Sequence, residues 1–158
     1  MLILYILSKK QKKAWVGHLV LEKLLINMAI AKPTIMTAVP RFYNNLYSKM
    51  QINLSKQSYL KKFLFNKTVE IGTKVNQKTH ISFLETLLNL LLSLLVRRKI
   101  KTQFGGNLIA FVSGGGPLDS QIGNTLNALG IKTLQGYGLT ETSPVVSCNP
   151  LTNIKVET

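Results

Sequence analysis

A continuous apolar run that ends in three consecutive glycines limits this chain to a few architectures. Asn107–Ser113 (NLIAFVS) is typical of a strand buried on both faces of a parallel sheet. The turn Gly114-Gly115-Gly116-Pro117 follows, and Asp119 or Ser120 can cap a helix that runs to about Leu129. A strand followed directly by a tight turn and a helix predicts the first half of a strand–helix–strand unit.

The second half of that unit comes at once. Gly130 suits the left-handed end of the helix, Ile131–Gln135 (IKTLQ) is a second predicted strand, and Gly136–Thr142 is a loop at its carboxyl end. The unit at about 107–136 predicts parallel strands with a right-handed crossover, hence an α/β fold with a partial parallel sheet and flanking helices. Both glycine-rich loops should fall on one sheet edge, where open α/β sheets bind ligands.

The region before this unit is predicted to be mostly helical. Residues 51–79 should form one helix and loops, and Gly105-Gly106 should end the last helix. The other expected elements are a helix at 15–31 that stops before Pro33, a strand at 34–39, a helix from Pro40 to Met50, and a long apolar helix at about 80–101.

The charge is concentrated in the same helical region. Residues 1–101 hold 18 basic and three acidic side chains, whereas residues 102–158 hold two and three. Seventeen of the 20 basic residues are lysines, and no nucleic-acid-binding signature is present, so a solvated basic surface is favoured over a specific nucleic-acid partner. The single cysteine, Cys148, excludes a disulfide framework and favours a reducing compartment such as the cytoplasm.

Two apolar segments raise the question of a membrane. Lysines follow Met1–Leu7 rather than precede it, the reverse of a secretory signal. Ile81–Val96 would span roughly 24 Å as a helix, short of the ~30 Å hydrocarbon core. Its polar residues (82, 85, 86, 89 and 93) form one stripe, so the helix is amphipathic. Packing of its apolar side on a core is favoured, and membrane association through residues 80–101, aided by Arg97-Arg98-Lys99 and Lys101, stays open.

The second loop carries the side chains with the most chemistry. Tyr137 offers a ring for stacking, Thr140 a hydroxyl for a phosphate oxygen, and Glu141 a carboxylate of the kind that Mg²⁺ prefers. Alone, each has a structural explanation: a core aromatic, a cap and a surface acid. Together, beside glycines that let a flat ligand lie on the backbone, they favour a nucleotide–Mg²⁺ site.

Three segments resemble one known family. Phe111–Asp119 (FVSGGGPLD), then Leu134–Pro144 (LQGYGLTETSP), look like the AMP-binding, adenylate-forming enzymes, most of all the long-chain fatty acid–CoA ligases. Pro33–Arg41 (PTIMTAVPR) resembles the motif ahead of that family's helical insert. The resemblance implies an atypical segment at 1–20 and a partial large domain at 21–158. Within it would lie a helical insert at about 41–104 and a nucleotide-binding portion at about 105–150.

By this resemblance, ATP activates a long-chain fatty acid as an acyl-adenylate, and CoA then takes the acyl group. Gly114, Gly115, Gly116 and Pro117 would flank the adenine and the acyl tunnel. The opposite wall would be formed by Gly136, Tyr137, Gly138 and Leu139, with Tyr137 against the adenine ring. Thr140 would bind phosphate and Glu141 would ligate Mg²⁺, which makes these two the expected catalytic residues.

The resemblance does not extend to every family motif. The Ser/Thr/Gly-rich phosphate loop, the ribose-binding aspartate, the hinge and the C-terminal adenylation lysine have no counterpart here, so we expect an internal piece of a longer enzyme that cannot complete adenylation alone. The alternative is a non-catalytic, lysine-rich protein that binds anionic membranes or nucleic acid. A dinucleotide-binding oxidoreductase is excluded because no GxGxxG follows a strand.

Overall fold

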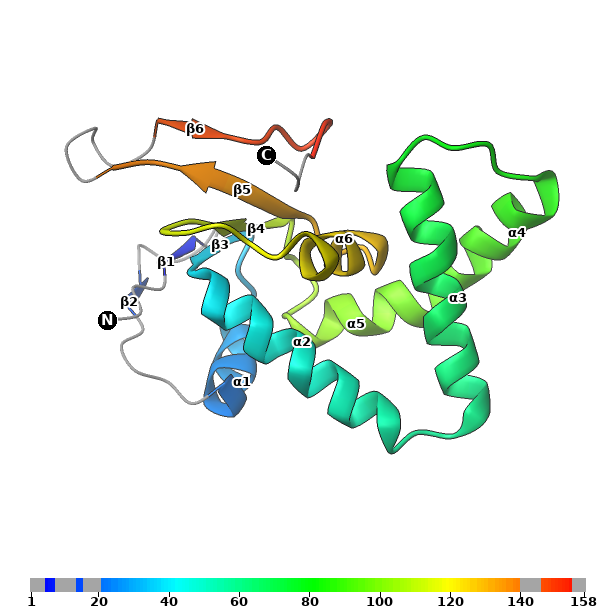
Figure 1. Cartoon of the computed structure of the whole chain (residues 1–158). Helices are drawn as coiled ribbons and strands as arrows, with labels where there is room; N and C mark the ends of the chain where they lie inside the picture. The colour runs from blue at the N-terminus through cyan, green and yellow to red at the C-terminus, as the bar shows by residue number, and fades with distance from the viewer. Residues whose placement is uncertain (1–4, 8–13, 16–20, 140–145, 155–158) are drawn as a thin grey trace.

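The computed structural model describes residues 5–7, 14–15, 21–139 and 146–154, and its strands form one six-stranded sheet. The strand order is β2-β1-β3-β4-β5-β6 (Figure 1). The strands are β1 (Tyr5–Leu7), β2 (Ala14–Trp15), β3 (Ile35–Ala38), β4 (Ala110–Ser113), β5 (Thr133–Tyr137) and β6 (Ser147–Cys148).

The three central strands, β3, β4 and β5, are parallel, which confirms the predicted α/β fold. Phe111 of β4 lies opposite Met36 of β3 and Thr133 of β5, so the two strands of the predicted strand–helix–strand unit are direct neighbours. On either side of these three strands, β1 pairs antiparallel with β3, and β6 pairs antiparallel with β5. Strands β1, β2 and β6 were not predicted, because two or three residues carry too little pattern to identify a strand.

Helices account for most of the remaining described chain. They are α1 (Leu21–Ala31), α2 (Pro40–Ser55), α3 (Tyr59–Asn76), α4 (Phe83–Leu92), η1 (a π-helical turn, Ser93–Arg97), α5 (Arg98–Gln103) and α6 (Ser120–Ala128). The helix predicted at 15–31 is wrong at its start, because Trp15 lies in β2 and α1 begins at Leu21. Gly136 and Tyr137, predicted as loop, are the last two residues of β5, where they pair with β6.

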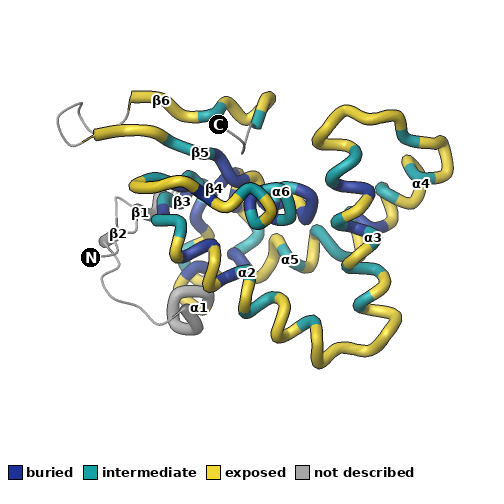
Figure 2. The backbone as a smooth tube through the Cα atoms, in the orientation of Figure 1, coloured by how far each residue is buried: buried dark blue, intermediate teal, exposed yellow. Residues whose placement is uncertain are grey.

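The core lies where the aromatic side chains of α2 meet the centre of the sheet. The Phe111 ring contacts Phe42, Tyr43 and Phe104 edge to face, with centroids 5.8, 5.7 and 5.5 Å away. Pro40 at the first turn of α2 starts this helix directly after β3, so α2 runs back over the sheet. Figure 2 shows the buried residues concentrated in the centre of the sheet, the first half of α2 and α6, with β6 and most of α4 exposed.

The helical region docks onto the sheet portion through close contact of α3 and η1 with the end of α6. A Cβ on Gly72 of α3 would overlap the carbonyl oxygen of Ala128 and lie 2.8 Å from its Cα. Arg97 donates from Nε to that same oxygen (2.9 Å) and from Nη1 to Asn89 Oδ1 (2.7 Å). Partial burial lowers the pKa of the Arg97 guanidinium.

The long apolar helix faces the opposite way from the favoured prediction. Two half-buried residues of its polar stripe face inward: Glu85 accepts a hydrogen bond from Lys74 of α3 (2.6 Å), and Asn89 accepts the one from Arg97. Of the apolar side chains in α4, only Leu92 is buried. The prediction that the apolar side packs on the core is therefore wrong for this structure, because α3 offers charged and polar partners. No helix in the described segments is long and apolar enough to cross a bilayer.

Candidate functional site

The three recognisable motifs converge at the carboxyl ends of the parallel strands. Ala38 of β3, Ser113 of β4 and Gln135 of β5 occupy one row of the sheet. The chain leaves this row through Val39-Pro40, the triple-glycine turn and Gly136-Tyr137. The Gly114 N–H donates to the Ala38 carbonyl oxygen (3.2 Å), which ties the glycine turn to the end of β3.

The triple-glycine turn presents an open backbone. Gly115 has φ +80°, a conformation that side-chain-bearing residues rarely adopt, so this position requires glycine. A Cβ at Gly116 would meet only ordinary contact, 3.7 Å from Pro40 Cγ. Gly115, Gly116 and Pro117 are exposed, whereas Asp119 is engaged in accepting a hydrogen bond from the Ile122 N–H (3.0 Å) as the cap of α6. The turn therefore offers bare backbone to a flat ligand.

The second loop lies against the first. A Cβ on Gly114 would stand 3.8 Å from the Gly136 carbonyl oxygen, so the two glycine segments are neighbours as predicted. At Gly136 itself a Cβ would press on Val112 Cγ1 at 3.3 Å. Tyr137 is 60% exposed, which excludes its interpretation as a core aromatic. Gly138 and Leu139 follow it and are also exposed.

The two predicted catalytic residues, Thr140 and Glu141, lie outside the described residues. The described chain stops at Leu139 and resumes at Val146, whose N–H donates to the Tyr137 carbonyl oxygen (2.9 Å). In the described ranges no group of three or more His, Cys, Asp or Glu side chains gathers to hold a metal ion. A single carboxylate with substrate phosphates is nevertheless enough for Mg²⁺, so the assignment of Glu141 stays a prediction.

Two buried polar atoms directly before the glycine segments were not predicted. Ser113 Oγ and Gln135 Oε1 are buried, and neither has a hydrogen-bond partner among the described residues. The two residues are paired across β4 and β5 and precede Gly114 and Gly136. The sequence does hold a sign of this pair, because a polar residue ends each of the two predicted strands. Side chains alternate along a strand, so Ser113 and its partner Gln135 lie on the same face of the sheet as Phe111. Such unpaired atoms are where an ordered water or a ligand group would be bound.

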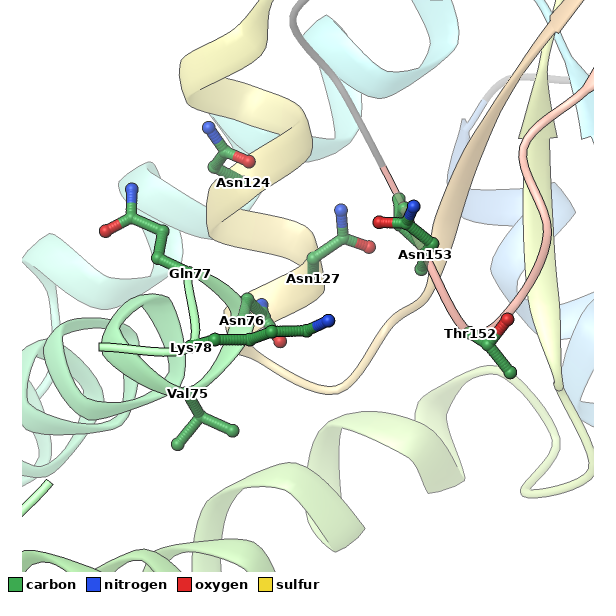
Figure 3. A pocket seen from close by; sticks show the side chains of 9 residues that line it. Val75, Asn76, Gln77, Lys78, Asn124, Asn127, Thr152 and Asn153 are labelled. Carbon is green, nitrogen blue, oxygen red and sulfur yellow. The ribbon is translucent and has the colours of Figure 1, made fainter. Parts of the chain in front are cut away.

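A separate cavity lies at the other end of α6. It has a volume of about 260 Å³ and is lined mainly by amide side chains from α3, α6 and the segment after β6 (Figure 3). Asn127 on its wall accepts a hydrogen bond from the Thr133 N–H at the start of β5 (2.7 Å), so this cavity faces the amino end of that strand. None of its lining residues belongs to a glycine segment.

Comparison with known proteins decides the family. The sequence pattern that defines the AMP-binding enzyme family matches residues 18–158 of this chain, which include both glycine segments and the upstream motif. The chain belongs to the AMP-binding enzyme family. This family is adenylate-forming, so membership implies the use of ATP.

Relatives within the AMP-binding enzymes include fatty acid-activating proteins. The chain is 38% identical to long chain acyl-CoA synthetase 4 of Arabidopsis thaliana, over 75% of this chain and 18% of the relative. It is 29% identical to a long-chain-fatty-acid–CoA ligase of Mycobacterium bovis, over 87% of this chain and 23% of the relative. The adenylation domain of a carboxylate reductase from Mycobacterium chelonae is similar at 18% identity with a TM-score of 0.44, over 84% of this chain and 17% of that one. The chain thus spans about a fifth of the length of these relatives.

Proposed function

We propose that this chain supplies the adenine-binding walls of a long-chain fatty acid–CoA ligase. In the first step a carboxylate oxygen of the fatty acid attacks the α-phosphorus of ATP, and pyrophosphate leaves with the electron pair of the broken P–O bond. In the second step the CoA sulfur attacks the acyl carbon, its proton is lost, and AMP leaves. Support for the long-chain acid comes from the named activities of the relatives, which are moderately similar.

The observation that carries the proposal is the contact of the two glycine segments at one sheet edge. Gly114 and Gly136 are neighbours, and the exposed Tyr137 follows Gly136 as the last residue of β5. A purine placed there would have bare backbone on one side and an aromatic ring on the other. Stacking of a base on an aromatic ring contributes about 1–3 kcal/mol, enough to orient the nucleotide.

The phosphates need positive charge and hydrogen-bond donors, and the loop after Tyr137 is the proposed source. Thr140 would donate its hydroxyl proton to a phosphate oxygen, and Glu141 would hold Mg²⁺, which in turn neutralises charge on the phosphates. Reactions of this kind depend on positioning and electrostatic stabilisation more than on acid–base groups. Asp119 is committed to capping α6, so it does not compete for the metal ion.

Binding of a fluorescent ATP analogue with and without Mg²⁺ tests the proposal. Tyr137→Ala should weaken binding about tenfold or more through loss of stacking. Glu141→Gln should abolish the gain in affinity that Mg²⁺ provides, whereas Glu70→Gln, a change of the same kind on α3, should leave it intact. Equal affinities for the parent chain and Tyr137→Ala would disprove the adenine-binding role.

We further propose that these 158 residues do not turn over alone, because they lack counterparts of the family's phosphate loop and adenylation lysine. An ATP–pyrophosphate exchange assay with palmitate should therefore give no signal above a blank. Exchange that requires both palmitate and the chain would show that the missing motifs are dispensable.

A further inference from the structure

The outlying helical region exposes a continuous apolar surface. Helices α4, η1 and α5 follow one another without a break from Phe83 to Gln103, about 30 Å at the usual rise per residue. Six leucines at helical spacing on α4 and η1 form what we name the leucine face: Leu84, Leu87, Leu88, Leu91, Leu94 and Leu95. Their exposed fractions run from 37% to 74%, so the larger part of this face is in water.

The leucine face is fixed in its outward orientation by the polar side of the same helix. Glu85 is bound to Lys74 of α3, and Arg97 links Asn89 to the Ala128 carbonyl oxygen. Turning the leucines inward would break these contacts and place apolar side chains against the charged Lys74 and Arg97. An apolar face of this size on a fixed helix marks an interaction surface. Figure 1 places α4 on the side of the molecule away from the sheet.

Charge at the end of this helix indicates which partner fits. Arg98, Lys99 and Lys101 of α5 are all exposed. None of these three cations forms an ion pair with a carboxylate in the described part of the chain. A net charge of +14 opposes close approach of a second copy and favours a negatively charged partner.

We propose that the leucine face docks on an anionic phospholipid membrane surface. The helix from Phe83 to Gln103 lies in the plane of the interface, with its leucines in the outer part of the acyl layer. The cationic groups of α5 reach the lipid phosphates, and their aliphatic stems lie along the apolar boundary. This arrangement needs no change in the fold, since the surface that it uses is already exposed. It is independent of the proposed ligase activity.

Flotation of the 158-residue chain with lipid vesicles tests the docking. The chain should bind phosphatidylcholine vesicles that contain phosphatidylserine, bind pure phosphatidylcholine vesicles more weakly, and lose binding between about 0.1 and about 0.5 M NaCl. Leu84→Gln/Leu95→Gln should lower the partition coefficient about tenfold or more, because two apolar side chains no longer enter the lipid. Both positions are exposed, so folding should be retained, which circular dichroism would check.

Matched substitutions elsewhere separate docking from general stickiness. Ile52→Gln on α2 removes an equally exposed apolar side chain (57%) outside the leucine face and should leave binding unchanged. Lys99→Gln should weaken binding to the anionic vesicles, whereas Lys132→Gln should not. The proposal is overturned if Leu84→Gln/Leu95→Gln binds as the parent does, or if binding ignores phosphatidylserine. It is also overturned if the parent chain self-associates through the leucine face without binding vesicles.

Discussion

Tyr43 buries its hydroxyl in the aromatic core without a hydrogen-bond partner among the described residues. Desolvation raises the pKa of this phenol far above its ordinary value, so it is neutral throughout the physiological range. Tyr43→Phe keeps the ring contacts with Phe42 and Phe111 and removes the unpaired group. We expect the free energy of unfolding to rise by about 1 kcal/mol, measured by urea denaturation.

Tyr43→Leu provides the comparison, because it removes the hydroxyl and also the two edge-to-face contacts. It should lower the free energy of unfolding by about 1–3 kcal/mol. A loss of stability in Tyr43→Phe would mean that the hydroxyl is bonded in solution, for example to an ordered water.

Some placements in the candidate site could be predicted from the sequence, and others could not. The contact of Gly114 with Gly136 followed from strand order alone, because parallel neighbours end at the same edge. The inclusion of Gly136 and Tyr137 in β5 could not be foreseen, since the pairing depends on β6, a strand of only two residues. The unpaired atoms of Ser113 and Gln135 are likewise visible only once packing around them is known.

At the level of elements, one ion pair holds α4 to α3. Lys74 Nζ lies 2.6 Å from Glu85 Oε1, and this contact lowers the pKa of Glu85 below 4.5 and raises the pKa of Lys74 above 10.5. Since the unfolded chain protonates Glu85 first, the stabilisation is present above about pH 4.5 and is lost as pH falls through the lower folded-state pKa. For Lys74 the stabilisation is lost as pH rises through its raised folded-state pKa.

Glu85→Gln tests this linkage while preserving the start of the helix. A glutamine can still accept the hydrogen bond that Glu85 Oε2 takes from the Ser82 N–H (2.9 Å), so the capping box survives. The melting temperature of the variant should fall less steeply than that of the parent between about pH 5 and pH 3. The main partner of Glu70 is Lys67 on the same helix, so Glu70→Gln should change the melting temperature in this acid range less. If the melting temperatures of Glu85→Gln and the parent fall equally between about pH 5 and pH 3, the ion pair does not stabilise the fold.

The elements themselves were predictable in proportion to their length and their boundary residues. Pro40 marked the start of α2, and Gly130 marked the end of α6, because each residue has a backbone preference that few contexts override. The facing of α4 was not predictable in this way. A periodic pattern shows that a helix has two sides, but which side packs depends on the partner, and here Lys74 and Arg97 favour the polar one.

For the whole molecule, the coupling of the helical region to the sheet depends on the close approach of α3 to α6. The lack of a Cβ at Gly72 is what allows α3 to reach the backbone of Ala128. Gly72→Ala must push the two helices apart and strain the hydrogen bond from Arg97 to Ala128. We expect a loss of about 1–3 kcal/mol in the free energy of unfolding, as for other overpacked sites.

Gly116→Ala serves as the control, because a Cβ there meets only an ordinary contact at 3.7 Å and the backbone is not left-handed. It should lower the free energy of unfolding by less than about 1 kcal/mol. If both variants unfold at the same urea concentration as the parent, the α3–α6 contact does not hold the two parts of the molecule together.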